Sequence, residues 1–206
     1  MEEMELEILR KATEMFNRYG LRPVTMDDIA REMSISKKTL YKYFSNKEDL
    51  VRKAVMAMFE EIRGNMDQLL EHSGNAIDML FAMDNVVCTT IERHDPSMQF
   101  QLDRYYPEVS AMLESLKKEQ VFKMMYNNIK KGKAEGLYRP ELDAEVVTFL
   151  YYSRAQLMME EDMGPFKDRP IDEVMREILI YHVRGVASPK GIEYLEQKLK
   201  TPNTWK

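Results

Sequence analysis

Apolar side chains recur every three or four residues along almost the whole chain, which is the period of an amphipathic α-helix. One of these stripes holds for over five turns within residues 47–72, without a proline, and therefore predicts one long helix. A convincing alternation of apolar and polar residues, the pattern of a half-buried strand, is missing from the sequence. The sequence thus predicts an all-α protein.

Capping residues divide the N-terminal part into shorter helices. Gly20 is typical of a helix C-cap, whereas Thr25 and Ser36 are typical of N-caps. They predict a first helix that stops at Gly20, a second that runs through Met33 and a third from 37 to 43 or 44. Ser45 and Asn46 then cap the long helix. Beyond residue 72 the pattern predicts helices at about 75–93, 97–103, 107–134, 143–162 and 171–186, and a last one that begins at Ser188.

Charge is distributed unevenly along the chain. The net charge is −5, yet the segment 36–53 holds six Lys and Arg residues against two acidic ones. Tyr41, Tyr43 and Phe44 lie between these cations. The segment is therefore the best candidate for contact with a polyanion such as nucleic acid. Alternatively, the charges form an ordinary solvated helix face.

Two short helices joined by a turn of three or four residues, with a third helix upstream, have the geometry of a helix-turn-helix. The second short helix is then the one that reads DNA. Leu40 and Phe44 are its core residues, which leaves Lys37, Lys38, Thr39 and Lys42 on the exposed face. These side chains supply donors for base edges and phosphates.

The same residues carry a family resemblance. Residues 36–50 read SKKTLYKYFSNKEDL, and apolar, glycine and hydroxyl residues precede them at matching positions from Ala12 to Ala30. Over residues 5–52 this sequence resembles the N-terminal DNA-binding domain of the TetR family of transcriptional regulators. It departs from the family with Ser34 in the turn, where Gly is usual, and with Lys38, where a small residue is frequent. Ser34 should cost little if its backbone avoids the left-handed region.

The resemblance implies roles for individual residues. Lys37 and Lys38 would face the major groove, with Thr39 at its margin. Tyr41, Tyr43 and Lys47 would bind phosphates. Thr25 would cap its helix and reach a phosphate, and Tyr41 has packing as an alternative role. The predicted DNA-binding residues are Thr25, Lys37, Lys38, Thr39, Tyr41, Lys42, Tyr43 and Lys47.

The resemblance also implies a DNA-binding domain at 1–50 and a helical effector-binding and dimerisation domain at 51–206. Wide apolar stripes on the segments 143–162 and 171–186 suggest a four-helix dimer interface, or alternatively an intrachain core. The predicted interface residues are Phe149, Leu150, Ile171, Val174, Met175, Ile178, Leu179 and His182.

The sequence contains 18 methionines, and methionine adapts to irregular cavities. This abundance favours a flexible apolar effector pocket, although the same side chains could be plain core. The candidate lining residues are Phe81, Met83, Phe100, Tyr105, Met124, Met125, Tyr126, Tyr152 and Met159.

Other classes of function find little support in the sequence. There is no glycine-rich phosphate loop, the three His residues are widely spaced, and Cys88 is the single cysteine, so we expect no enzyme, no cofactor and no metal. The lack of a long apolar run and of a basic N-terminus predicts a cytoplasmic protein with no membrane partner. The expected partners are double-stranded DNA, a small-molecule effector and a second copy of the chain. We expect a repressor that a small apolar or amphipathic ligand releases from a palindromic operator; the alternative is a DNA-bound regulator whose C-terminal domain contacts a protein and senses no small molecule.

Overall fold

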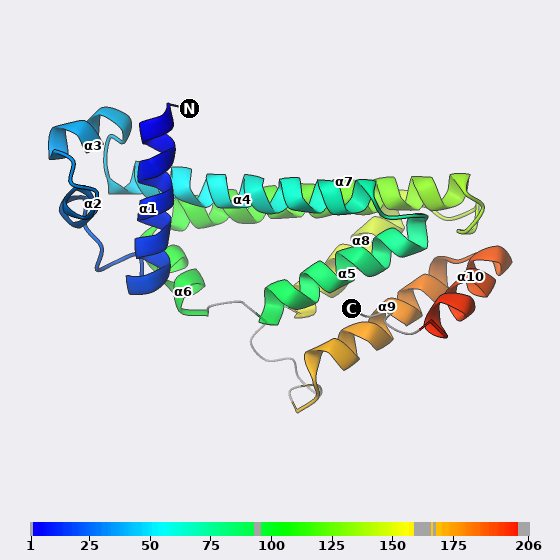
Figure 1. Cartoon of the computed structure of the whole chain (residues 1–206). Helices are drawn as coiled ribbons and strands as arrows, with labels where there is room; N and C mark the ends of the chain where they lie inside the picture. The colour runs from blue at the N-terminus through cyan, green and yellow to red at the C-terminus, as the bar shows by residue number, and fades with distance from the viewer. Residues whose placement is uncertain (1, 93–95, 159–165, 167, 202–206) are drawn as a thin grey trace. The chain divides into compact units, whose positions relative to one another are not determined.

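The computed structural model describes residues 2–92, 96–158, 166 and 168–201, and these residues are almost entirely helical (Figure 1). These residues form no β-strand, and their only β-type pairing is an isolated antiparallel bridge between Tyr138 and Ala187. The prediction of an all-α fold is confirmed. In chain order the helices are α1 (Glu3–Tyr19), α2 (Met26–Glu32), α3 (Lys37–Tyr43), α4 (Lys47–Glu71), α5 (Ala76–Glu92), α6 (Pro96–Tyr105), α7 (Pro107–Ala134), α8 (Ala144–Met158), α9 (Ile171–Val186) and α10 (Pro189–Leu199).

The predicted N-caps explain where the short helices begin. The Thr25 hydroxyl accepts a hydrogen bond from the Asp28 N–H at 3.2 Å, and the Asp28 carboxylate accepts one from the Thr25 N–H at 3.0 Å. This reciprocal pair is a capping box, which satisfies two backbone donors at once. Ser36 accepts from the Thr39 N–H at 3.0 Å and so caps α3.

The chain packs as two compact units. The N-terminal unit comprises residues 1–64 and 95–116, and the C-terminal unit comprises residues 65–94 and 117–206. Helix α4 is continuous from Lys47 to Glu71, so its last turns belong to the C-terminal unit. The functional boundary at residue 50 stays a prediction.

The core of the N-terminal unit is built from α1 to α4 together with α6 and the beginning of α7. Ile8 and Ala12 of α1, with Leu40 and Phe44, have no exposed surface. Leu102 of α6 is buried in the same cluster. The two short helices are thus fixed by tertiary burial, because helices of two turns are unstable alone.

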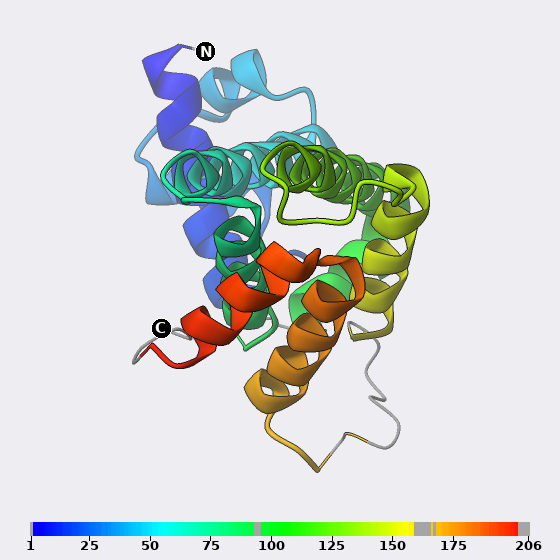
Figure 2. The ribbon, with the colours of Figure 1, turned by 90° about the vertical axis from the view of Figure 1, so that its right-hand side faces the viewer.

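The C-terminal unit has its own core, formed by α5, α7, α8, α9 and α10. Figure 2 shows α10 folding back from the end of α9 toward α5. Two contacts fix it there: the Tyr194 hydroxyl donates to the Asp78 carboxylate at 2.7 Å, and the Lys198 ammonium lies 2.8 Å from the same group. Within the described part of the chain, no helix is both long enough and apolar enough to span a bilayer.

The turn between α2 and α3 differs from expectation at Ser34. Its φ is 55°, which places a non-glycine residue in the left-handed region. The backbone of Ser34 thus does not avoid the left-handed region, so serine is expected to cost stability at this position. A side chain in this region is strained by contact between its Cβ and the backbone, at a cost of about 1 kcal/mol.

Candidate nucleic-acid interface

Helix α3 turns one apolar residue inward and its basic residues outward. Leu40 is fully buried, whereas Lys37, Lys38 and Lys42 are exposed. Tyr41 is 49% exposed, so about half of its surface is available to a partner. The exposed face therefore combines ammonium groups and an aromatic hydroxyl, which suits contacts to phosphates and base edges.

The three lysines of this face differ in their surroundings. Lys37 forms an ion pair with Asp27 of α2, with 2.5 Å between the ammonium and the carboxylate. The Lys42 ammonium lies 5.1 Å from the centre of the Tyr43 ring. In the part of the chain that the structure describes, neither Lys38 nor Lys42 pairs with a carboxylate. Lys38 and Lys42 are thus the more available cations.

Lys47, the first residue of α4, is held differently. Its ammonium donates a hydrogen bond to the carbonyl oxygen of Arg22 at 3.1 Å. Desolvation by burial lowers the pKa of Lys47, and the nearby Asp28 carboxylate partly opposes this shift. An ammonium has three donors, so a bond to Arg22 leaves two for another acceptor.

The hydroxyl groups of Thr25 and Thr39 serve the helix N-termini. Thr25 Oγ1 donates to the Asp28 carboxylate at 2.6 Å, and Thr39 Oγ1 lies 2.8 Å from the Ser36 hydroxyl. Hydrogen bonds from Thr25 lower the pKa of Asp28. Tyr43 is half-buried and packs against the core of the N-terminal unit. The capping role predicted for Thr25 is confirmed, while phosphate contacts of these residues stay predictions.

Two cations of the basic segment are paired with carboxylates, one across helices and one within α4. The Lys53 ammonium binds both the Glu5 carboxylate and the Tyr43 carbonyl at 3.0 Å, and it lies 4.8 Å from the centre of the Phe44 ring. Arg52 pairs with Asp49 at 2.8 Å. Counting charges along the sequence could not separate Lys53 from the exposed lysines, because its partner Glu5 is brought close by tertiary packing.

Known proteins share this arrangement of helices. The family model of the bacterial regulatory proteins of the tetR family matches residues 8–54. The transcriptional repressor KstR2 of Mycobacterium tuberculosis is 27% identical over 145 residues, which cover 68% of this chain and 72% of KstR2. The chain thus resembles TetR-family transcriptional regulators, and the family model matches its N-terminal helices.

Solved structures resemble the chain over nearly its whole length. A transcriptional regulator from Cytophaga hutchinsonii has a TM-score of 0.71 and 18% identity, and the match covers 91% of this chain and 100% of that one. A regulator from Saccharomonospora viridis, described in complex with choline, has a TM-score of 0.67 and 17% identity with the same coverage. At this level of identity the likeness concerns the TetR fold alone.

The structure does not bring all the predicted effector residues together. Phe81, Met83 and Met125 are at most 3% exposed in the core of the C-terminal unit, and Met124 packs against them. The Tyr152 ring packs on that of Phe122, at 5.3 Å between centres, and Tyr126 is half-buried. By contrast, Phe100 and Tyr105 lie on α6 in the N-terminal unit, and Phe100 is 62% exposed. Met159 lies outside the described residues.

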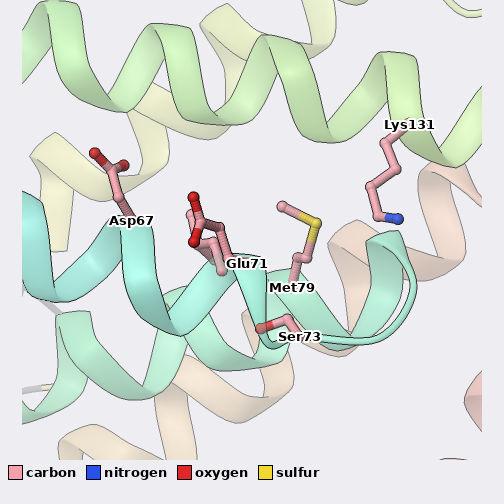
Figure 3. A pocket seen from close by; sticks show the side chains of 6 residues that line it. Asp67, Glu71, Ser73, Met79 and Lys131 are labelled. Atoms are coloured by element: carbon pink, nitrogen blue, oxygen red, sulfur yellow. The ribbon is translucent and has the colours of Figure 1, made fainter.

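An open cleft in the C-terminal unit was missed by the sequence analysis. It has a volume of about 460 Å³ and lies between the last turns of α4, the beginning of α5 and α7. Figure 3 shows Asp67 and Glu71 on α4, with Lys131 hanging from α7. Helical spacing makes Asp67 and Glu71 neighbours, but nothing in the sequence pattern places Lys131 near them. The cleft is lined by Asp67, Leu70, Glu71, Ser73, Met79 and Lys131.

The residues of the predicted dimer interface fall into two groups. Phe149 and Leu150 of α8 are 57% and 60% exposed, which is unusual for large apolar side chains. Val174, Met175 and Leu179 of α9 are at most 2% exposed and are occupied by packing within the chain. Ile178 and His182 are half-buried, and Ile171 begins α9. Helix α9 packs chiefly against α5.

Proposed function

We propose that this protein is a TetR-family transcriptional repressor that binds double-stranded DNA through α3 and the beginning of α4. Support comes from the exposed basic face of α3, where Lys38 and Lys42 stand beside Tyr41 on a helix capped at Ser36. The repressor name of the KstR2 relative supports the sign of regulation. In this proposal Lys37 and Lys38 contact base edges, and Tyr41, Tyr43 and Lys47 contact phosphates.

Selection of random duplexes by the purified protein tests this proposal. The affinity for the selected duplex is then measured over a series of salt concentrations. We expect an enriched palindrome, because a symmetric dimer presents two copies of α3 about one DNA turn, roughly 34 Å, or somewhat more apart. We also expect affinity to fall steeply with salt, because phosphate contacts release counterions. Binding without enrichment and without salt dependence would contradict the proposal.

Two variants separate base contacts from phosphate contacts. Lys47→Ala is expected to weaken binding to all duplexes about equally and to reduce the salt slope by about one unit per protomer. Lys38→Ala is expected to relax sequence preference at a cost of about 1–3 kcal/mol. Lys123→Ala, an exposed lysine of α7 in the C-terminal unit, is the control with the same change in charge. Unchanged preference in Lys38→Ala would show that α3 is not the reading helix.

We further propose that the C-terminal unit binds a small apolar or amphipathic effector that releases the DNA. Support comes from methionine and aromatic side chains in its core, among them Phe81, Met83 and Met125. Release requires only that the effector favour the free form over the DNA-bound form by a few kcal/mol. A ligand screen that follows dissociation of the selected duplex tests this; ligands that raise the melting temperature without releasing DNA would argue against it.

We propose that dimerisation uses the exposed face of α8, where Phe149 and Leu150 stand out from the surface. Burying two large apolar side chains per protomer would contribute about 1.5–3 kcal/mol for each. Sedimentation of wild type and of the double variant Phe149→Ser with Leu150→Ser tests the assignment. A variant that remains dimeric would place the interface elsewhere.

A further inference from the structure

Arg22, in the loop between α1 and α2, joins α6 to the first residue of α4 within the N-terminal unit. Its backbone N–H donates to Gln101 Oε1 at 3.1 Å, and its guanidinium donates to the Tyr105 hydroxyl at 3.1 Å. The guanidinium carbon also lies 5.2 Å from the centre of the Tyr105 ring. On its other side, the Arg22 carbonyl accepts the hydrogen bond from Lys47. We call this set of four residues the Arg22 bridge.

The loop and α6 approach each other closely at Gly20. This residue has a φ of 86°, and a Cβ placed on it would lie 2.8 Å from Gln101 Oε1. Only glycine combines this backbone conformation with room for the Gln101 side chain. Helix α6 is itself anchored, because Leu102 is 4% exposed in the core that α1 and α4 share. The helix is thus a firm support for the loop.

The bridge fixes Lys47 before any partner arrives. A free lysine side chain loses rotamer entropy when it binds, and this loss weakens the contact that it makes. In the structure the Lys47 ammonium is already ordered by the Arg22 carbonyl. Its remaining donors can take a phosphate oxygen without breaking that bond. The Arg22 carbonyl is in turn held in place by the hydrogen bonds that Arg22 donates to Gln101 and Tyr105.

We propose that Gln101 and Tyr105 are positioning residues for DNA binding, which act through Arg22 to hold the Lys47 ammonium in place for a phosphate. This inference rests on the proposed function, since it needs DNA as the partner. The proposal assigns a role in DNA binding to two residues of α6 that do not themselves contact DNA. Tyr105 thereby leaves the set of effector candidates.

A double-mutant cycle on the full chain tests the inference. Gln101→Leu keeps the side-chain size but removes the acceptor for the Arg22 N–H. With Lys47 present, it is expected to lower affinity for the selected duplex about three- to tenfold. In the Lys47→Ala background the same change is expected to matter less than about twofold, because the residue to be positioned is gone. Tyr105→Phe, which keeps the ring and removes the hydroxyl, is expected to behave in the same way with a smaller effect.

A conservative variant and a stability measurement complete the design. Gln101→Glu keeps an oxygen acceptor, so its effect on affinity is expected to be equal, within about twofold, in both backgrounds. Thermal unfolding of each variant reports any loss of fold. If Gln101→Leu lowered the affinity for DNA equally in both backgrounds, or in neither, the positioning role would be overturned. DNA binding by the wild type would still leave the proposed function intact. A wild type that binds no duplex would instead refute the proposed function.

Discussion

The caps of the short helices in the N-terminal unit and the contacts that join helices in the C-terminal unit differ in their reach along the chain. In the N-terminal unit the caps at Thr25, Ser36 and Asn46 each bond a residue three positions further on. In the C-terminal unit the Asn128 amide donates to the Ala76 carbonyl, 52 residues away, and Tyr194 bonds Asp78 across 116 residues. A short motif can predict the first kind of contact but not the second. The N-terminal unit also holds long-range contacts, such as that from Arg22 to Gln101, so the contrast lies between caps and contacts that join helices.

The largest expected effect concerns a glycine in the C-terminal unit. A Cβ on Gly191 would lie 2.0 Å from the Leu137 carbonyl oxygen, which is backbone and cannot move aside cheaply. Gly191→Ala is therefore expected to reduce the free energy of unfolding by about 2–3 kcal/mol. Urea denaturation measures the loss, and hydrogen exchange should show it in α9 and α10 more than in α1 to α3.

Gly64→Ala is the matched control for this substitution. Gly64 lies inside α4, and a Cβ there would meet no atom within 4 Å. Alanine is the better helix former, so this variant is expected to gain up to about 1 kcal/mol. Equal behaviour of the two variants would contradict the close approach of α10 to the chain at Leu137.

Sequence periodicity located the helices of both units because burial on one face of a helix leaves a local pattern. The ends of α9 at Ile171 and Val186 agree with the predicted segment 171–186, and α3 ends at Tyr43, within the predicted range. The same stripe on α9 could not reveal its partner. Val174 and Leu179 face their own chain, and only the fold shows that α5 covers them.

The candidate DNA site was likewise predictable only in its local part. The exposure of Lys38 and the burial of Leu40 follow from helical geometry around one cap. The inward turn of Lys53 toward Glu5 and the bond from Lys47 to Arg22 depend on how α1, α4 and the intervening loop pack. Gln101 entered no motif, since its partner lies 79 residues away.

A smaller effect is expected from the long-range pair that fixes α10. Burial alone would raise the pKa of Asp78, but hydrogen bonds from Lys198 and Tyr194 outweigh it and lower the pKa. Asp78→Asn removes the charged acceptor and is expected to cost about 1–2 kcal/mol at pH 7. Urea denaturation measures this difference, and Glu193→Gln, which neutralises an exposed carboxylate on α10, is the control.

The pH dependence of this pair follows from the direction of the shift. Because the pKa of Asp78 is lowered on folding, its contribution is fully present above the unfolded value of about 3.9 and is lost as pH falls through the lower folded value. Burial raises the pKa of Tyr194, so its own contribution is present below about pH 10 and is lost above that. The difference between wild type and Asp78→Asn should therefore shrink below about pH 4. A difference that stayed constant down to pH 3 would show that the pair is not the cause.

The smallest expected effect tests a disagreement between local sequence and local structure at Ser34 of the N-terminal unit. Ser34 has a φ of 55° in the turn before α3, a conformation that glycine adopts without strain. Ser34→Gly is expected to raise the free energy of unfolding by about 0.5–1 kcal/mol, because the relief of strain exceeds the added entropy of the unfolded chain. Ser36→Ala, two residues on, removes a cap and should instead lower it by about 1 kcal/mol. If Ser34→Gly did not raise the free energy of unfolding in urea denaturation, contacts of the serine side chain would offset the strain. Serine would then stabilise the turn as well as glycine does, and its left-handed conformation would carry no net cost.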